Sequence, residues 1–198
     1  MGLSFHYSGR IANPDSLPDL IDEVVDICKT FKWKYHVFER QFPKDTIVMA
    51  DHNQKLYGIC FTPPECEMVD VCFLSNGRMS GPMLLQNWGH SRNPKEKEYL
   101  YMISVKTQYA GIEIHRNIIQ LFRYLKEKYL TDFTMSDEGE YWETNDEAVL
   151  KENFKRYTDL IDGFALALES QNPEKGEDLE TYLLRLAQQL HDRRKGKE

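Results

Sequence analysis

The sequence has no long hydrophobic run. No apolar stretch in this 198-residue chain approaches the roughly 18 residues that a helix needs to cross a bilayer. The first residues also lack the basic region and apolar block of a secretory signal. Hydrophobic residues nevertheless make up 41% of the chain, which is enough to build a core. We therefore expect a folded cytoplasmic protein without a membrane anchor.

Cysteine is scarce and is not spaced for metal binding or redox exchange. The four cysteines are Cys28, Cys60, Cys66 and Cys72. No two of them form the Cys-x-x-Cys pair of zinc knuckles and thioredoxin-type sites, so we expect free thiols that pack as small apolar groups. Cys66 is the only cysteine predicted in a loop. Its neighbours Glu65 and Glu67 would raise its thiol pKa and oppose thiolate chemistry.

The common catalytic motifs are also absent. The sequence has no glycine-rich phosphate loop, no Gly-x-Ser-x-Gly nucleophile motif, and no HExxH or HxH pair. The six histidines are scattered, so a metal site that used them would have to be assembled from distant segments. We predict no cofactor from these patterns.

Basic residues are too few to offset the acidic ones, and the imbalance is local. The formal net charge is −7, and seven acidic residues lie between Asp132 and Glu147, a stretch without Lys or Arg. Without these seven, the 32 acidic residues fall to 25, which equals the number of basic residues. Nucleic-acid binding depends on a basic face, so we expect no nucleic-acid partner. The lack of a long apolar run leads us to expect no membrane partner either.

The pattern of apolar residues predicts an α+β fold, with a mostly antiparallel sheet packed by two helices. Strands are predicted at residues 3–11, 33–42, 46–50, 56–61, 68–74, 99–108, 133–135 and 140–143, and helices at 17–31 and about 112–130. A hairpin centred near residues 65–66 would place Cys60 almost opposite Cys72. Asn76-Gly77 predicts a two-residue turn with positive φ at both positions. Residues 81–94 are predicted to be irregular, and 95–98 an exposed charged link.

The chain changes character after Thr144. Thr144 and Glu147 form a predicted capping box for a helix that runs to about residue 170, and a last helix follows. We therefore expect an α+β domain over 1–145 and an antiparallel helical hairpin over 146–198 that packs on it. The face of the last helix that carries Leu183, Leu186 and Leu190 would either pack on its own domain or dock on a partner or a second copy, as in a homo-oligomer.

The acidic segment is the best candidate for a functional site. Its candidate residues are Asp137, Glu138, Glu140, Tyr141, Trp142 and Glu143. On a predicted strand after Gly139, Glu140 and Trp142 would share one face. Three interpretations stay open: a solvated hairpin, a protein-binding patch, or carboxylates that hold a hard cation such as Mg²⁺ or act as an acid–base pair.

These patterns do not determine a function. The leading hypothesis is a non-catalytic binding or regulatory protein whose acidic and aromatic surface at residues 132–147 meets a basic protein partner. Aromatic side chains tend to anchor interfaces, and an acidic rim speeds encounter with a basic surface. The alternative is a metal-dependent hydrolase that uses carboxylates of the same segment and a histidine from elsewhere.

Overall fold

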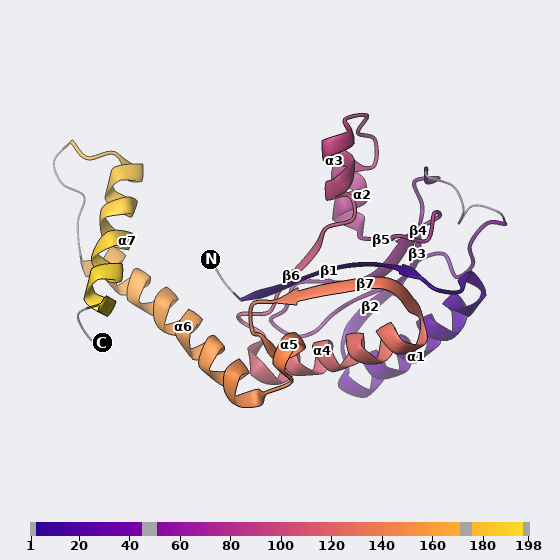
Figure 1. Ribbon diagram of the computed structural model, residues 1–198, viewed down its shortest axis with the longest axis horizontal. Coiled ribbons are helices and arrows are strands. Elements are labelled where there is room, and N and C mark those ends of the chain that lie inside the picture. Colours follow the sequence, from indigo (N-terminus) through magenta and orange to yellow (C-terminus); the bar gives the residue numbers. More distant parts are fainter. Residues whose placement is uncertain (1–2, 45–50, 171–175, 196–198) are drawn as a thin grey trace.

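The computed structural model confirms the predicted mixture of helices with antiparallel sheets (Figure 1). The structure describes residues 3–44, 51–170 and 176–195, so the predicted strand at 46–50 lies outside the described residues. Within the described ranges, every helix is too short or too polar to span a lipid bilayer.

Strand β1 (Ser4–Ile11) is the centre of the first sheet, which has the order β6-β1-β7. Strands β6 (Ile103–Lys106) and β7 (Leu130–Asp137) pair with it antiparallel on opposite edges. Phe5 therefore lies between Val105 and Asp137. The pairing shifts register between Ser8 and Arg10.

The second sheet has the order β2-β3-β4-β5, and its strands are also antiparallel. The strands are β2 (Lys34–Val37), β3 (Leu56–Thr62), β4 (Val69–Leu74) and β5 (Met79–Ser80). The hairpin of β3 and β4 is present as predicted, but Cys72 lies two residues from the position opposite Cys60. Cys60 pairs with Asp70, because the loop is centred on Glu65, whose φ is +54°.

The two sheets meet at a junction that we call the seam. Arg10 of β1 forms an isolated antiparallel bridge with Arg78, and the Ile11 N–H donates to the carbonyl of Gly77 at 3.0 Å. Since β7 pairs with the opposite edge of β1, Arg78 occupies the edge that β6 leaves free. The Asn-Gly turn before Arg78 is confirmed, although Gly77 (φ +77°) alone takes positive φ.

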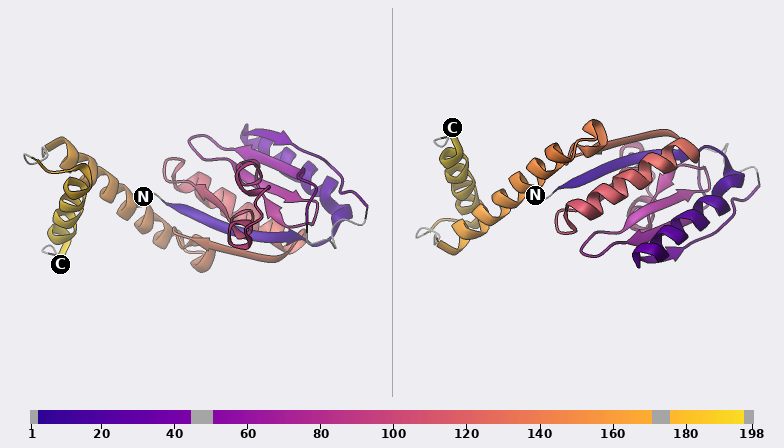
Figure 2. Two further views of the ribbon diagram at one scale, coloured as in Figure 1. Left: turned by 90° about the horizontal axis from the view of Figure 1, so that it is seen from above. Right: turned by 90° about the horizontal axis from the view of Figure 1, so that it is seen from below.

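Helices α1 (Leu17–Phe31) and α4 (Gly111–Lys128) lie side by side under one face of the sheets (Figures 1 and 2). A 3-10 turn, η1 (Pro14–Ser16), leads into α1. Both helices have the apolar stripe that the sequence predicts, and they bury it against the strands. The largest fully buried side chains of this core include Phe5, Phe61, Phe73, Phe122, Leu17, Leu20, Ile59 and Ile118.

Two short helices stand on the opposite face, where the sequence predicted irregular chain. Helix α2 (Pro82–Trp88) and helix α3 (Pro94–Tyr99) cover a second apolar cluster. The cluster consists of Leu56, Cys60, Cys72, Leu74, Leu100 and Tyr101. The prediction was wrong because each proline occupies the first turn of its helix, where no backbone donor is needed.

The acidic segment is extended as far as Asp137 in β7, but it is helical after Glu140, where a strand was predicted. Helix α5 (Tyr141–Thr144) replaces the predicted strand and lies between two left-handed residues, Glu140 (φ +58°) and Asn145 (φ +55°). Helix α6 (Glu147–Ser170) then begins. The predicted Thr144 cap is wrong, because the carboxylate of Asp146 accepts from the Ala148 N–H at 2.7 Å, while the Thr144 hydroxyl bonds to the carbonyl of Glu140.

The C-terminal helical hairpin is present and extends away from the sheets (Figures 1 and 2). Leu150, Phe154 and Tyr157 in the first half of α6 pack on the body of the protein. Helix α7 (Leu179–Lys195) turns back across the far half of α6. A separate small cluster there contains Ala167, Tyr182 and Leu186.

Gly58 and Gly111 both have positive φ, but a larger side chain would also clash at Gly58. Gly58 of β3 has φ +118°, and a Cβ there would lie 2.4 Å from the carbonyl oxygen of Val71. Gly111 has φ +85°, and its Cβ would meet nothing within 4 Å. In urea unfolding, we expect Gly111→Ala to lower the free energy of unfolding by about 1 kcal/mol. Gly58→Ala should cost more, and equal losses would contradict the strand packing described for β3 and β4.

Candidate binding site

Asp137, the first of the predicted site residues, lies in a buried hydrogen-bond network. His115 Nε2 of α4 is 3.1 Å from Asp137 Oδ2, and His115 Nδ1 is 2.7 Å from Thr107 Oγ1. The His115 ring therefore bridges the Thr107 hydroxyl and the Asp137 carboxylate. The arrangement of Thr107, His115 and Asp137 resembles a catalytic triad of hydroxyl, imidazole and carboxylate, but all three side chains are buried. We interpret the network as a structural clamp.

The backbone completes this clamp. Asp137 Oδ1 accepts from the Gly139 N–H at 2.7 Å, and Oδ2 accepts from the N–H groups of Tyr141 and Trp142 at 2.9 and 3.1 Å. Burial alone would raise the pKa of Asp137, but the hydrogen bond and charge of His115, with the backbone donors, hold that pKa below its ordinary value. Asp137 thus fixes the start of α5.

The other predicted carboxylates do not converge. Glu138 Oε2 accepts from the Ser4 N–H at 2.7 Å, and Glu143 Oε1 accepts from the Asp137 N–H at 3.1 Å. Glu140 is exposed, whereas Tyr141 is buried with its hydroxyl 2.9 Å from Gln120 Nε2. In the part of the chain that the structure describes, no three His, Cys, Asp or Glu side chains are grouped to hold a metal ion.

Trp142 is half-buried and faces cations of its own chain. Arg123 Cζ lies 5.1 Å and Lys126 Nζ 5.4 Å from its ring. Arg123 also donates to the backbone carbonyls of Tyr141 and Trp142, at 2.9 and 2.8 Å. The predicted sharing of one face by Glu140 and Trp142 is wrong, because α5 is not a strand.

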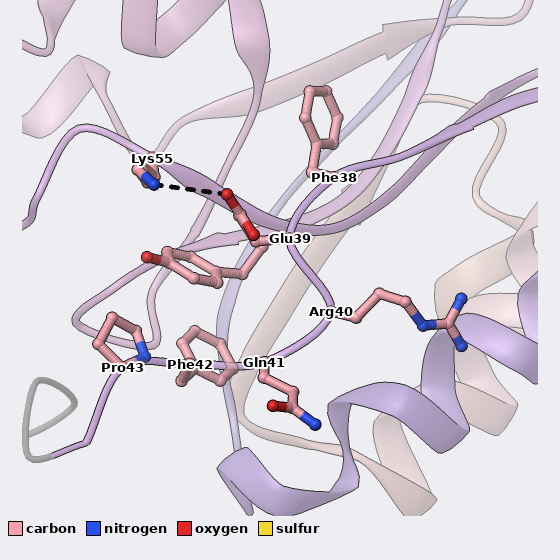
Figure 3. A pocket seen from close by; sticks show the side chains of 8 residues that line it. Phe38, Glu39, Arg40, Gln41, Phe42, Pro43 and Lys55 are labelled. Carbon is pink, nitrogen blue, oxygen red and sulfur yellow. Dashed lines mark hydrogen bonds and ion pairs between the residues drawn. The ribbon is translucent and has the colours of Figure 1, made fainter.

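A hollow of about 580 Å³ lies beside β2, and Figure 3 shows its side chains. Its lining includes Phe42 and Tyr57, whose rings stack at 4.9 Å. Lys55 Nζ pairs with Glu39 Oε1 at 3.5 Å, and Arg40 pairs with Asp22 of α1. Its charged groups are thus engaged within the protein, which leaves little to recognise a ligand.

Two other hollows share three lining residues, Arg78, Glu98 and Tyr101, and we call them together the seam cleft. The first, of about 380 Å³, lies on the β1 and β7 side and is lined by His6, Ser8, Thr134 and Ser136, among others. The second, of about 500 Å³, lies between residues 51–54 and the α2–α3 region.

The Arg78 side chain is held in a fixed position in the seam cleft. Its guanidinium Cζ lies 3.3 Å from the centroid of the Tyr101 ring. Asn76 holds both partners, since its Nδ2 donates to the Tyr101 hydroxyl at 3.2 Å and its Oδ1 accepts from the Arg78 N–H at 3.1 Å. No carboxylate among the described residues forms an ion pair with Arg78.

This stacking leaves the donors of Arg78 available. The contact with Tyr101 uses the face of the planar guanidinium, whereas its N–H donors lie in the plane. A planar fork of donors matches a carboxylate or a phosphate and can bind it through two parallel hydrogen bonds. Arg78 is only partly buried and lines both hollows, so an anion can reach it.

The cysteines give no nucleophile. All four are free thiols, as predicted. Burial, followed by the charge of Glu67, raises the pKa of Cys66 to about 12, in the direction that the sequence predicted. Burial likewise raises the pKa of Cys28 and of Cys60 to about 11. At neutral pH these groups remain thiols.

The sequence predicted the turn that carries Arg78 but not the role of Arg78. Its partner, Tyr101, lies beyond α2 and α3 in the chain, and no local pattern links the two. The signal that was present is the Asn-Gly turn, whose Asn76 makes the connecting hydrogen bonds.

The clamp interpretation predicts a pH-dependent loss of stability. Asp137→Asn should lower the free energy of unfolding at pH 7 by about 3 kcal/mol, because it removes one partner of a buried network. Since the folded-state pKa is lowered, the wild-type carboxylate stabilises the fold above a pH of about 4 and loses that effect as the pH falls. The difference between the proteins in urea unfolding should therefore shrink below that pH.

The exposed Glu140→Gln is the matched control, with an expected change below about 0.5 kcal/mol. A similar, pH-independent effect of both substitutions would contradict the clamp.

Comparisons with known proteins give no relative. No protein family matches the chain, and no curated protein or solved structure shows significant similarity to it.

Proposed function

We propose that this is a non-catalytic binding protein that captures an anionic group, a carboxylate or a phosphate, in the seam cleft. The observation that carries the proposal is the Arg78 guanidinium, which is stacked on Tyr101 between two hollows and pairs with no carboxylate of the described chain. An incoming anion would supply the partner that the fold does not.

The physical basis is preorganisation. Asn76 and Tyr101 hold the guanidinium in place before a ligand arrives, so binding loses less side-chain freedom. A hydrogen bond to a charged group contributes about 1.5–3 kcal/mol, which corresponds to roughly 10- to 150-fold in affinity. Partial burial of Arg78 strengthens the attraction, because the surrounding protein screens charge less than water does.

Three observations favour binding over catalysis. The thiols have raised pKa values, and the Thr107–His115–Asp137 network is buried. The alternative of a metal-dependent hydrolase would need the carboxylates of residues 137–143 to face one point, whereas Glu138 and Glu143 bond to backbone N–H groups.

The acidic segment at 132–147 is a weaker candidate for the binding surface. Asp137 and Tyr141 are buried, and Trp142 lies against Arg123 and Lys126. A basic protein partner would thus meet mainly Glu140 and its exposed neighbours. The cytoplasm remains our proposed compartment, because all four cysteines are free thiols and disulfides are rare there.

The role of Arg78 can be tested with two simple anions, benzoate and phenyl phosphate. A ligand that binds only the folded state raises Tm, so at least one of them should give a saturable rise in wild type. Arg78→Ala should weaken binding at least about tenfold, and Arg78→Lys should be intermediate because it keeps the charge without the planar fork.

Arg92→Ala is the matched control, because Arg92 is exposed and lines neither hollow of the seam cleft. The proposal fails if neither anion raises Tm, or if the loss is as large in Arg92→Ala as in Arg78→Ala. Circular dichroism of each variant checks that the fold is retained.

A further inference from the structure

The larger hollow of the seam cleft offers charges of both signs. Arg78 and Lys97 line it together with two carboxylates, Asp51 and Glu98. None of these four forms an ion pair with another described residue. The hollow therefore presents two cations and two anions whose charges are not consumed by the fold.

These four charges disfavour a ligand that carries only negative or only positive charge. A simple anion on Arg78 would be attracted by Lys97 but repelled by Glu98, which lines the same hollows. A ligand that carries a positive group beside its negative group turns this repulsion into a second attraction. Specific sites use charges that repel the wrong ligand as well as charges that attract the right one.

The rest of the lining defines the neutral part of the ligand. Trp88, Leu100 and Tyr101 supply apolar wall, and Ser91 and Gln54 supply uncharged polar groups. The Nδ1 atom of His52 accepts from the Gln54 N–H at 3.2 Å, so a neutral His52 carries its proton on Nε2 as a further donor. The volume of about 500 Å³ suits a small molecule with one apolar side chain.

We infer that the ligand of the seam cleft is a zwitterion of the amino-acid type, with an apolar side chain. Its carboxylate binds the Arg78 fork, its ammonium group faces Glu98 and Asp51, and its side chain lies along Trp88. The inference rests on the proposed anion-binding function and adds that the ligand also carries a positive charge. The adjoining hollow, lined by hydroxyls such as those of Ser8 and Thr134, gives a second residue of a short peptide room to bind.

Calorimetric titration with related probes tests this inference. The probes are phenylalanine, N-acetylphenylalanine, phenylalaninamide and phenylalanylserine. Phenylalanine should bind wild type at least about fivefold more tightly than either blocked form, because each block removes one charge pair. Glu98→Gln should weaken phenylalanine by a similar factor but should not weaken N-acetylphenylalanine, because the repulsion between its carboxylate and Glu98 is removed. Arg78→Ala should weaken both.

The controls separate this inference from the proposed function. Glu113→Gln, at an exposed position on α4, should change nothing. If N-acetylphenylalanine binds wild type as tightly as phenylalanine and still depends on Arg78, the zwitterion inference is overturned and the anion site stands. If no probe depends on Arg78, both are overturned. Tighter binding of phenylalanylserine than of phenylalanine would identify a peptide, and the reverse a free amino acid, as the form of zwitterion that the cleft accepts.

Discussion

The hydroxyl of Tyr7 holds the two sheets together. It accepts a hydrogen bond from the Asp70 N–H at 3.0 Å and donates to the Asp70 carbonyl at 2.8 Å, which joins β1 to β4. Burial, with the charge of Asp70 next in size, raises the pKa of Tyr7 well above its usual value, so the donor proton is retained. The Tyr7 ring packs 4.5 Å from Phe122 of α4. This contact and the hydrogen bond from Ile11 to Gly77 together join the sheets at the seam on which Arg78 lies.

The backbone of Asp70 makes this contact, while its carboxyl side chain is buried in a surrounding that disfavours its charged form. Its Oδ1 is buried without a hydrogen-bond partner, and burial raises the pKa of the carboxyl to about 7. A Cβ at Gly81 would lie 2.1 Å from Asp70 Oδ2, so any larger residue at this position would force the Asp70 side chain to move. Since the folded state favours the protonated carboxyl, this group stabilises the fold least at high pH. The unfavourable burial of the Asp70 carboxyl occurs where the chain enters α2, which leads through α3 to Tyr101 at the seam.

The sequence predicted the elements that depend on local patterns. The apolar stripes of α1 and α4 and the hairpin of β3 and β4 follow from spacing alone. Helices α2 and α3 were missed because their prolines also suit a loop, and α5 was mispredicted because its start is fixed by Asp137, whose place depends on distant His115. Of the seam cleft, only the Asn76 turn was predictable, because the pairing of Arg78 with Tyr101 is created by the tertiary fold.

The central claim is that the seam cleft around Arg78 is the surface that binds. A ¹H–¹⁵N NMR titration with benzoate tests it most directly, because it locates an anion on the folded chain without any substitution. We predict that the largest saturable shift changes occur at the Arg78 side-chain Nε–H and at the backbone amides of Gly77, Arg78 and Tyr101. Largest changes within residues 137–147, which do not line the cleft, or weak changes spread over the surface without saturation, would contradict the account.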